Sequence, residues 1–189
     1  MDAMPRTRRV RLFEGMRLAS AGVTGAQVTV AWIKLGTASP SGAFPQDAQS
    51  LADGIAATIR NAKARYPNLV IAYLSSRICA GYATTSLNPD PYAYQSGFSV
   101  KRVVLDQITG TGNLNFDPAA GAVVAPWIAW GPYLWADGTT PRGDGVTWSC
   151  AGLQADGTHP SASGQAKVAQ MLLDFVQTDS TTSRCFLGP

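Results

Sequence analysis

The sequence is poor in histidine and cysteine, and this scarcity excludes several kinds of site. His159 is the only histidine, and Cys79, Cys150 and Cys185 lack the spacing that metal ligands usually show. We therefore predict no metal site and no cofactor. A disulfide between Cys150 and Cys185 is an open alternative, because sequence alone does not fix a pairing.

Long apolar runs are also missing. No stretch approaches the roughly 20 continuous apolar residues of a membrane helix, and residues 1–15 lack the apolar segment of a signal peptide. We expect no membrane partner and, for the chain as encoded, a cytoplasmic location. The abundance of Gly, Thr, Ser, Pro and Trp, with few Lys or Glu, is instead typical of secreted enzymes, so the location of related proteins stays open.

Charge is scarce too, and much of the positive excess lies at the start. Charged residues make up 14% of the chain and the net charge is +3. Several arginines fall within residues 6–17, without the interleaved aromatics of a nucleic-acid surface. We therefore predict no nucleic-acid partner, and interpret residues 6–17 as a helix with a solvated basic face.

Apolar residues are plentiful enough for a core. The chain has 189 residues, of which 46% are hydrophobic. With no internal repeat or linker, this predicts a single domain over residues 1–189, with residues 1–10 poorly ordered.

Residue periodicity predicts an α/β fold. Residues 28–35 and 69–75 are β-branched and aromatic runs without alternation, typical of parallel strands buried on both faces. Between them, residues 45–66 place apolar side chains at helical spacing. Further helices are expected over residues 94–108 and after Ser161 or Ser163, either of which could cap the last one. A third strand is expected over residues 123–130, weakened by Pro126.

Asp156 and His159 form the clearest chemical motif. They are three residues apart in the sequence Asp-Gly-Thr-His, which leads into the last helix. A carboxylate beside an imidazole can fix its tautomer and stabilise the imidazolium formed when the ring takes a proton from a serine. A tight turn of this kind can bring the two groups together.

The block DGTHPSASGQAKVA at 156–169 resembles the closing catalytic block of SGNH (GDSL-type) hydrolases. Residues 28–40, 66–83, 91–102 and 130–138 are also similar to that family. The resemblance implies a flavodoxin-like sandwich, here truncated to about three parallel strands with flanking helices. It also implies hydrolysis of acyl, acetyl or carbohydrate esters, with His159 as general base and Asp156 orienting it.

The chain departs from the family pattern at the nucleophile. The family's Gly-Asp-Ser-like block is not found, which indicates the C-terminal portion of such an enzyme. Gly36 and Thr37 occupy the place of an oxyanion donor, where the family has an asparagine. Ser75 and Ser76, at the end of a predicted strand, are weak candidates for a substitute nucleophile.

Two further interpretations remain open. Trp127, Trp130, Tyr133 and Trp135 either close the core or line one wall of a substrate cleft, for which Trp130, Tyr133 and Trp135 are the candidates. The chain is either a serine ester hydrolase or an inactive remnant that acts at most as a binding module through these aromatics. Without the family's first strand, residues 28–35 would leave an open edge, through which two chains could associate.

Overall fold

The computed structural model describes residues 17–183, which form a parallel sheet with helices on both faces. Strands β1 (Val30–Ile33), β2 (Ile71–Leu74) and β3 (Trp127–Trp130) lie in the order β1-β2-β3. Both pairings are parallel, with Trp32 opposite Tyr73 and Tyr73 opposite Ala129. The predicted α/β class is confirmed.

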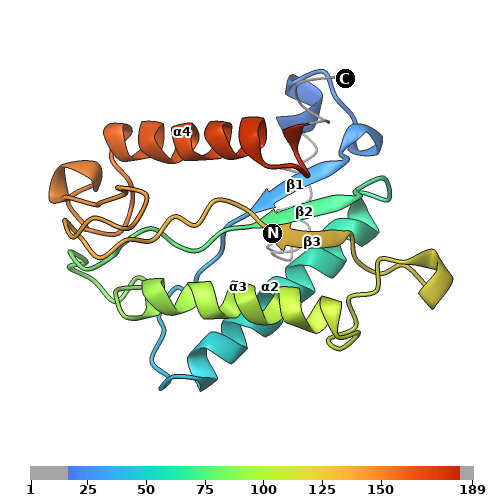
Figure 1. Cartoon of the computed structure of the whole chain (residues 1–189), viewed down its shortest axis with the longest axis horizontal. Helices are drawn as coiled ribbons and strands as arrows, with labels where there is room; N and C mark the ends of the chain where they lie inside the picture. The colour runs from blue at the N-terminus through green and yellow to red at the C-terminus, as the bar shows by residue number, and fades with distance from the viewer. Residues whose placement is uncertain (1–16, 184–189) are drawn as a thin grey trace, which may run out of the picture.

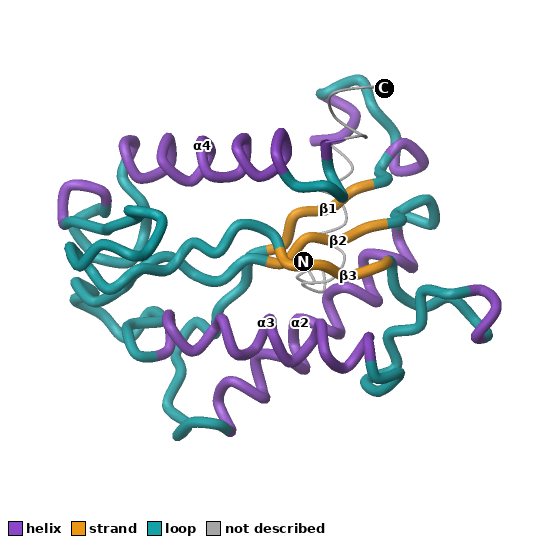
Figure 2. Tube along the Cα trace, in the orientation of Figure 1, coloured by secondary structure: helices purple, strands orange, loops and turns teal. Residues whose placement is uncertain are grey.

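The helices divide between the two faces of this sheet. Helices α2 (Gln46–Arg65) and α3 (Tyr92–Ile108) cover one face, and α4 (Ala162–Thr178) lies over the other (Figures 1 and 2). Short 3-10 turns occur at Gly25–Gln27, Pro118–Ala120 and Cys150–Gly152. Helix α4 begins after Ser161, whose Oγ accepts a hydrogen bond from the Gly164 N–H, so Ser161 is the cap.

The first core cluster lies between the sheet and helices α2 and α3. Ile55 and Ile59 of α2 are buried there, as the helical spacing of the sequence predicts. The hydroxyl of buried Ser99 in α3 also donates to the Ala48 carbonyl of α2. The buried members of the cluster are Ala52, Ile55, Ile59, Leu74, Val100, Val103, Leu114, Ala125 and Ile128.

A second cluster lies under the loops at the carboxyl ends of the strands. It is built around Trp148, which is 1% exposed and whose indole N–H donates to the Leu134 carbonyl at 2.8 Å. Val168 and Met171 of α4 pack against it. Its buried members are Ile78, Cys79, Leu134, Ala136, Trp148 and Leu153. This loop cluster anchors the segments that carry the candidate site.

The prediction that residues 28–35 are buried on both faces is wrong. No residue of β1 is fully buried, and Trp32 is 36% exposed. Among the described residues β1 is an edge strand, and the ring contact of α4 with the sheet falls on β2, between Phe175 and Tyr73. Strand β2, paired on both sides, is buried over Ala72, Tyr73 and Leu74 as expected.

Strand β3 is shorter than the predicted range 123–130. It begins at Trp127, directly after Pro126, which has no N–H for a sheet ladder. The Gln107 side chain donates to the Pro126 carbonyl and accepts from the Ile128 N–H, so a side chain fixes the start of this strand.

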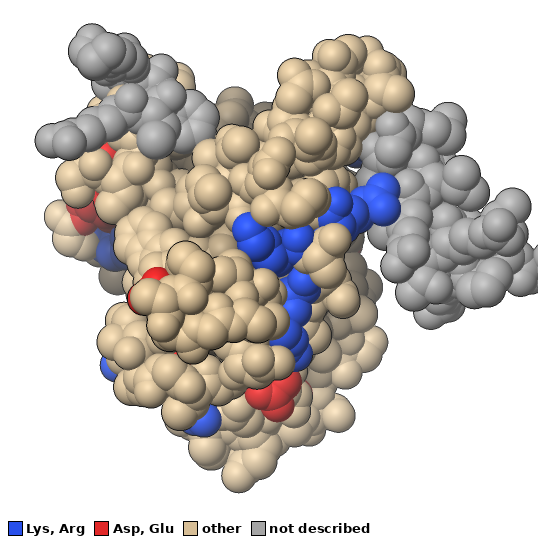
Figure 3. All heavy atoms as spheres, turned by 90° about the vertical axis from the view of Figure 1, so that its right-hand side faces the viewer, with Lys and Arg blue, Asp and Glu red and all other residues tan. Residues whose placement is uncertain are grey.

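The predicted helix over residues 6–17 lies outside the described residues except for Arg17, as does the segment 1–10. On the face shown in Figure 3, Lys and Arg side chains form a narrow stripe between neutral surfaces. Two basic side chains of α2 anchor loops, since Lys63 donates to the Pro67 and Leu69 carbonyls and Arg60 to that of Gly112. In the described part of the chain no helix is long and apolar enough to cross a membrane.

Candidate functional site

The structure brings Asp156 and His159 together in one turn. Nδ1 of His159 lies 2.5 Å from Oδ2 of Asp156, and Oδ1 of Asp156 accepts the N–H groups of Thr158 and His159, each at 3.0 Å. The carboxylate is therefore held by three donors and faces the ring edge that carries Nδ1. The His159 side chain remains 52% exposed.

Close backbone packing gives this turn its shape. Gly157 has φ +66°, and a β-carbon there would lie 1.8 Å from the Tyr82 carbonyl oxygen, so only glycine fits. The Asp156 carbonyl accepts from the Thr84 N–H at 3.0 Å. The hydroxyl of buried Thr158 donates to the Leu87 carbonyl. The turn is thus fixed against residues 82–87, which follow β2.

The electrostatics keep the carboxylate ionised. The hydrogen bond from His159, followed by the backbone N–H groups of His159 and Thr158, lowers the pKa of Asp156 to about 2. An ionised acceptor at Nδ1 holds the proton on that nitrogen and leaves Nε2 as the basic atom of the neutral ring. The pair can therefore act as an oriented general base.

Gly36 and Thr37 lie beyond the carboxyl end of β1, where sites of parallel sheets gather. A β-carbon on Gly36 would lie 3.0 Å from both Arg77 Cδ and Asn88 Oδ1, so its backbone is packed against these side chains. Asn88 directly follows Leu87, whose carbonyl binds the turn of the Asp–His pair. The structure thus connects the segment of Gly36 to the segment that supports His159.

Two basic side chains lie near this point, Lys34, for which the sequence suggested no role, and Arg77, which the sequence suggested only as a loop anchor. Burial and then the charge of Arg77 lower the pKa of Lys34 to about 8, and burial lowers the pKa of Arg77. Within residues 17–183 neither has a carboxylate at ion-pair distance, and Arg77 Nε is buried without a hydrogen-bond partner. Such uncompensated positive charge favours a group that becomes negative during a reaction. The only signal in the sequence is that Lys34 interrupts an apolar run.

Ser75 and Ser76 both make hydrogen bonds inside the protein. Ser75 is buried and its Oγ accepts the indole N–H of Trp32 at 2.9 Å. Buried Ser76 accepts the N–H groups of Leu134 and Trp135. The structure does not bring either serine into hydrogen-bond contact with His159, and this placement favours structural roles.

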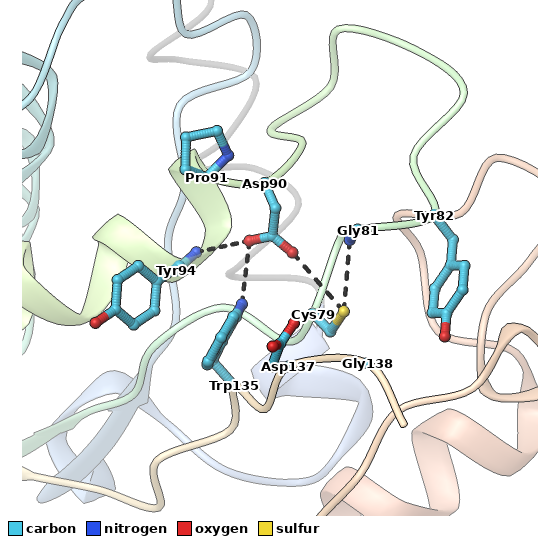
Figure 4. A pocket seen from close by; sticks show the side chains of 9 residues that line it. All are labelled: Cys79, Gly81, Tyr82, Asp90, Pro91, Tyr94, Trp135, Asp137 and Gly138. Carbon is cyan, nitrogen blue, oxygen red and sulfur yellow. Dashed lines mark hydrogen bonds between the residues drawn. The ribbon is translucent and has the colours of Figure 1, made fainter. Parts of the chain in front are cut away.

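The three candidate cleft aromatics have different surroundings, although the rings of Trp130 and Tyr133 pack edge to face with centroids 6.1 Å apart. Trp130 packs against the core cluster under α2 and α3. Tyr133 fits against Gly97 of α3 and lies under the Arg142 guanidinium, and burial raises its pKa. Trp135 lines the cavity shown in Figure 4, to which neither Trp130 nor Tyr133 contributes.

That cavity has a volume of about 430 Å³ and combines residues from separate loops and helix α3. Asp90, Tyr94 and Asp137 join Trp135 in its lining, with Cys79 and Tyr82 on the side of the loop after β2. Sequence analysis missed these partners because they are far apart in the chain. An Asp before a helix and aromatics within it are common, so no local signal marks them.

The cysteines and the acidic residues offer no metal site in the described part of the chain. Residues 17–183 contain no group of three or more His, Cys, Asp or Glu side chains that could hold a metal ion. Cys79 is buried, and burial raises the pKa of its thiol, which disfavours the reactive thiolate. Cys150 is exposed and is a free cysteine in the structure, so the disulfide considered for it is not formed there, and Cys185 lies outside the described residues. The interpretation of Asp156 and His159 rests on their geometry and sequence pattern, because in comparisons with known proteins no family model, curated protein or solved structure matches the chain.

Proposed function

We propose that this chain is a serine-type ester hydrolase of the SGNH kind, in which His159 is the general base and Asp156 orients it. The observation that carries the proposal is the 2.5 Å contact between His159 Nδ1 and an Asp156 carboxylate that two backbone N–H groups also hold. A half-exposed imidazole oriented in this way is suited to proton transfer with a group that approaches Nε2.

The proposed chemistry is a double displacement. Nε2 takes the proton of a serine hydroxyl while the serine oxygen attacks the ester carbonyl carbon, and the carbonyl electron pair moves onto its oxygen. That oxyanion returns its electrons as the C–O bond to the alcohol breaks, and the imidazolium gives its proton to the leaving alcohol. Water then attacks the acyl-enzyme by the same steps. Asp156 stabilises the imidazolium in both halves.

Every serine of the chain lies within residues 17–183, and the structure gives none of them a hydrogen bond to His159. We therefore place the nucleophile on a separate segment that pairs beside β1. Within residues 17–183, β1 has a sheet partner on one side only. A strand paired with its open edge would end near Gly36 and Thr37, in the region that Lys34 and Arg77 make positive. In this arrangement the oxyanion would form close to the positive charges of Lys34 and Arg77 and to the backbone of Gly36, which has no side chain to block its approach. The flavodoxin-like SGNH arrangement would supply such a strand.

A second candidate function is binding without catalysis. It is favoured by the cavity around Trp135, whose lining contains no histidine and whose carboxylate Asp90 already binds protein donors. The two candidate functions differ in what they require of His159, since only hydrolysis needs its basic nitrogen.

Hydrolysis of p-nitrophenyl acetate by the full chain tests the proposal. We expect a small protein-dependent rate, in which His159 Nε2 takes a proton from a water molecule that attacks the ester, because the serines of the chain do not contact His159. Removing the base in His159→Ala should bring that rate down to the rate of buffer alone. Ser75→Ala should leave the rate unchanged, since Ser75 binds Trp32.

A fluorophosphonate probe with peptide mapping tests whether any serine of this chain acts as the nucleophile. We expect no label on Ser75 or Ser76. An unchanged rate in His159→Ala would contradict the role of His159, and a label on either serine would contradict the placement of the nucleophile beside β1.

A further inference from the structure

The cavity next to the Asp156–His159 turn has an aromatic wall on one side. The rings of Trp135 and Tyr94 pack together with centroids 4.6 Å apart and planes at 51°. Figure 4 shows them on one side of the cavity and Tyr82 on the other. Tyr94 is 40% exposed although it is a large aromatic side chain. The wall thus offers an apolar ring surface to a ligand.

Asp90 fixes this wall and has little capacity left for a ligand. Its Oδ1 accepts the Trp135 indole N–H and the Tyr94 backbone N–H, each at 3.0 Å. Its Oδ2 accepts the Ala80 N–H at 2.9 Å and lies 3.7 Å from the Cys79 thiol. A carboxylate offers about four acceptor positions, so these donors occupy it. Asp90 therefore positions Trp135.

Asp137 differs from Asp90 because its carboxylate is exposed and accepts no hydrogen bond from the described residues. No Lys, Arg or His lines the cavity. Two carboxylates without a cation disfavour an anionic ligand. A free carboxylate beside aromatic rings is instead suited to a ligand that offers both hydroxyl donors and an apolar face.

We propose that this cavity binds a neutral sugar ring, stacked on Trp135 and Tyr94 and hydrogen-bonded through its hydroxyls to Asp137. A pyranose has C–H groups on its faces and hydroxyls at its rim, which matches an apolar wall with one free acceptor. The volume of about 430 Å³ lies within the range of ligand sites and accommodates such a ring. An organic cation fits less well. The Asp90 carboxylate already accepts hydrogen bonds from protein donors, and the rings of Trp135 and Tyr94 pack against each other instead of forming a cage around a cation.

The proposed sugar site adjoins the Asp156–His159 turn through Tyr82. This residue lines the cavity, and its carbonyl packs against Gly157 between Asp156 and His159. That the sugar is the alcohol part of the hydrolysed ester rests on the proposed function, whereas the binding itself does not.

Binding of three neutral sugars, xylobiose, cellobiose and N,N′-diacetylchitobiose, tests this inference on the full chain. Tryptophan fluorescence and saturation-transfer NMR report binding, and tetramethylammonium serves as the cationic probe. We expect at least one sugar to bind with a Kd of about 1 mM, and Trp135→Ala to weaken it about tenfold or more. Tyr94→Ala should do the same, and because its side chain is partly exposed this variant should fold even if Trp135→Ala does not. Trp127→Ala, which removes an exposed tryptophan outside the cavity, should change the Kd by less than about twofold.

The inference is overturned if none of the three sugars binds, if Tyr94→Ala leaves their binding unchanged, or if tetramethylammonium binds at Trp135 in their place. Sugar binding needs no nucleophile. Intact binding without His159-dependent hydrolysis therefore contradicts only the proposed function, while His159-dependent hydrolysis without sugar binding contradicts only the present inference.

Discussion

Gly157→Ala is expected to lower the free energy of unfolding by about 3 kcal/mol and to separate Asp156 from His159. The φ of +66° is unfavourable for alanine, and the new β-carbon would lie 1.8 Å from the Tyr82 carbonyl oxygen. Because that oxygen belongs to the backbone, the turn itself must move. Urea unfolding of the variant measures the first effect, and the NMR signals of the single histidine report the second.

Gly143→Ala is the matched control for this change. Gly143 also lies in a loop, but a β-carbon there would meet no atom within 4 Å. We expect its free energy of unfolding to stay within about 0.5 kcal/mol of the parent. If Gly157→Ala proved as stable as Gly143→Ala, the close packing of the Asp156–His159 turn on residue 82 would be incorrect.

Trp148→Ala is expected to lower the free energy of unfolding by about 3–5 kcal/mol, the usual cost of removing a buried aromatic. Trp148 is 1% exposed and lies in the loop cluster that supports both the Asp156–His159 turn and the cavity. The substitution also leaves the Leu134 carbonyl without its indole donor. We expect a lower urea midpoint together with loss of sugar binding.

The comparison with Trp127→Ala separates burial from the chemistry of the side chain. Trp127 of β3 is 36% exposed, so the same substitution removes less buried apolar surface and should cost clearly less than Trp148→Ala. Equal losses in the two variants would contradict the position of Trp148 at the centre of the loop cluster.

The sequence predicted the elements better than it predicted their surroundings. Ile55 and Ile59 recur at helical spacing, so α2 could be located before the structure was known. The run over residues 28–35 likewise indicated β1, but its exposure could not be predicted. Burial of a strand depends on which strand or helix lies beside it, and the apolar pattern of one segment does not contain that information.

In the candidate site, too, the sequence predicted the local feature but not the one that depends on distant segments. Asp156 and His159 are three residues apart, so a local turn brings them together and the motif alone predicted the pair. The cavity depends instead on Trp135, Asp90 and Tyr94, which meet only after the loops behind β2 and β3 pack on α3. Asp90 could not be distinguished from an ordinary residue before a helix, because its role comes from donors elsewhere in the chain.

The most direct test of the account is ¹⁵N NMR of the single imidazole, since His159 is the only histidine in the chain. At a pH where the ring is neutral, we predict the proton on Nδ1 and an unprotonated Nε2, because Nδ1 donates to the ionised Asp156. In Asp156→Ala the ring should shift toward the Nε2–H form. A proton on Nε2 in the parent protein, or the same tautomer in both proteins, would contradict the role of this pair as an oriented general base.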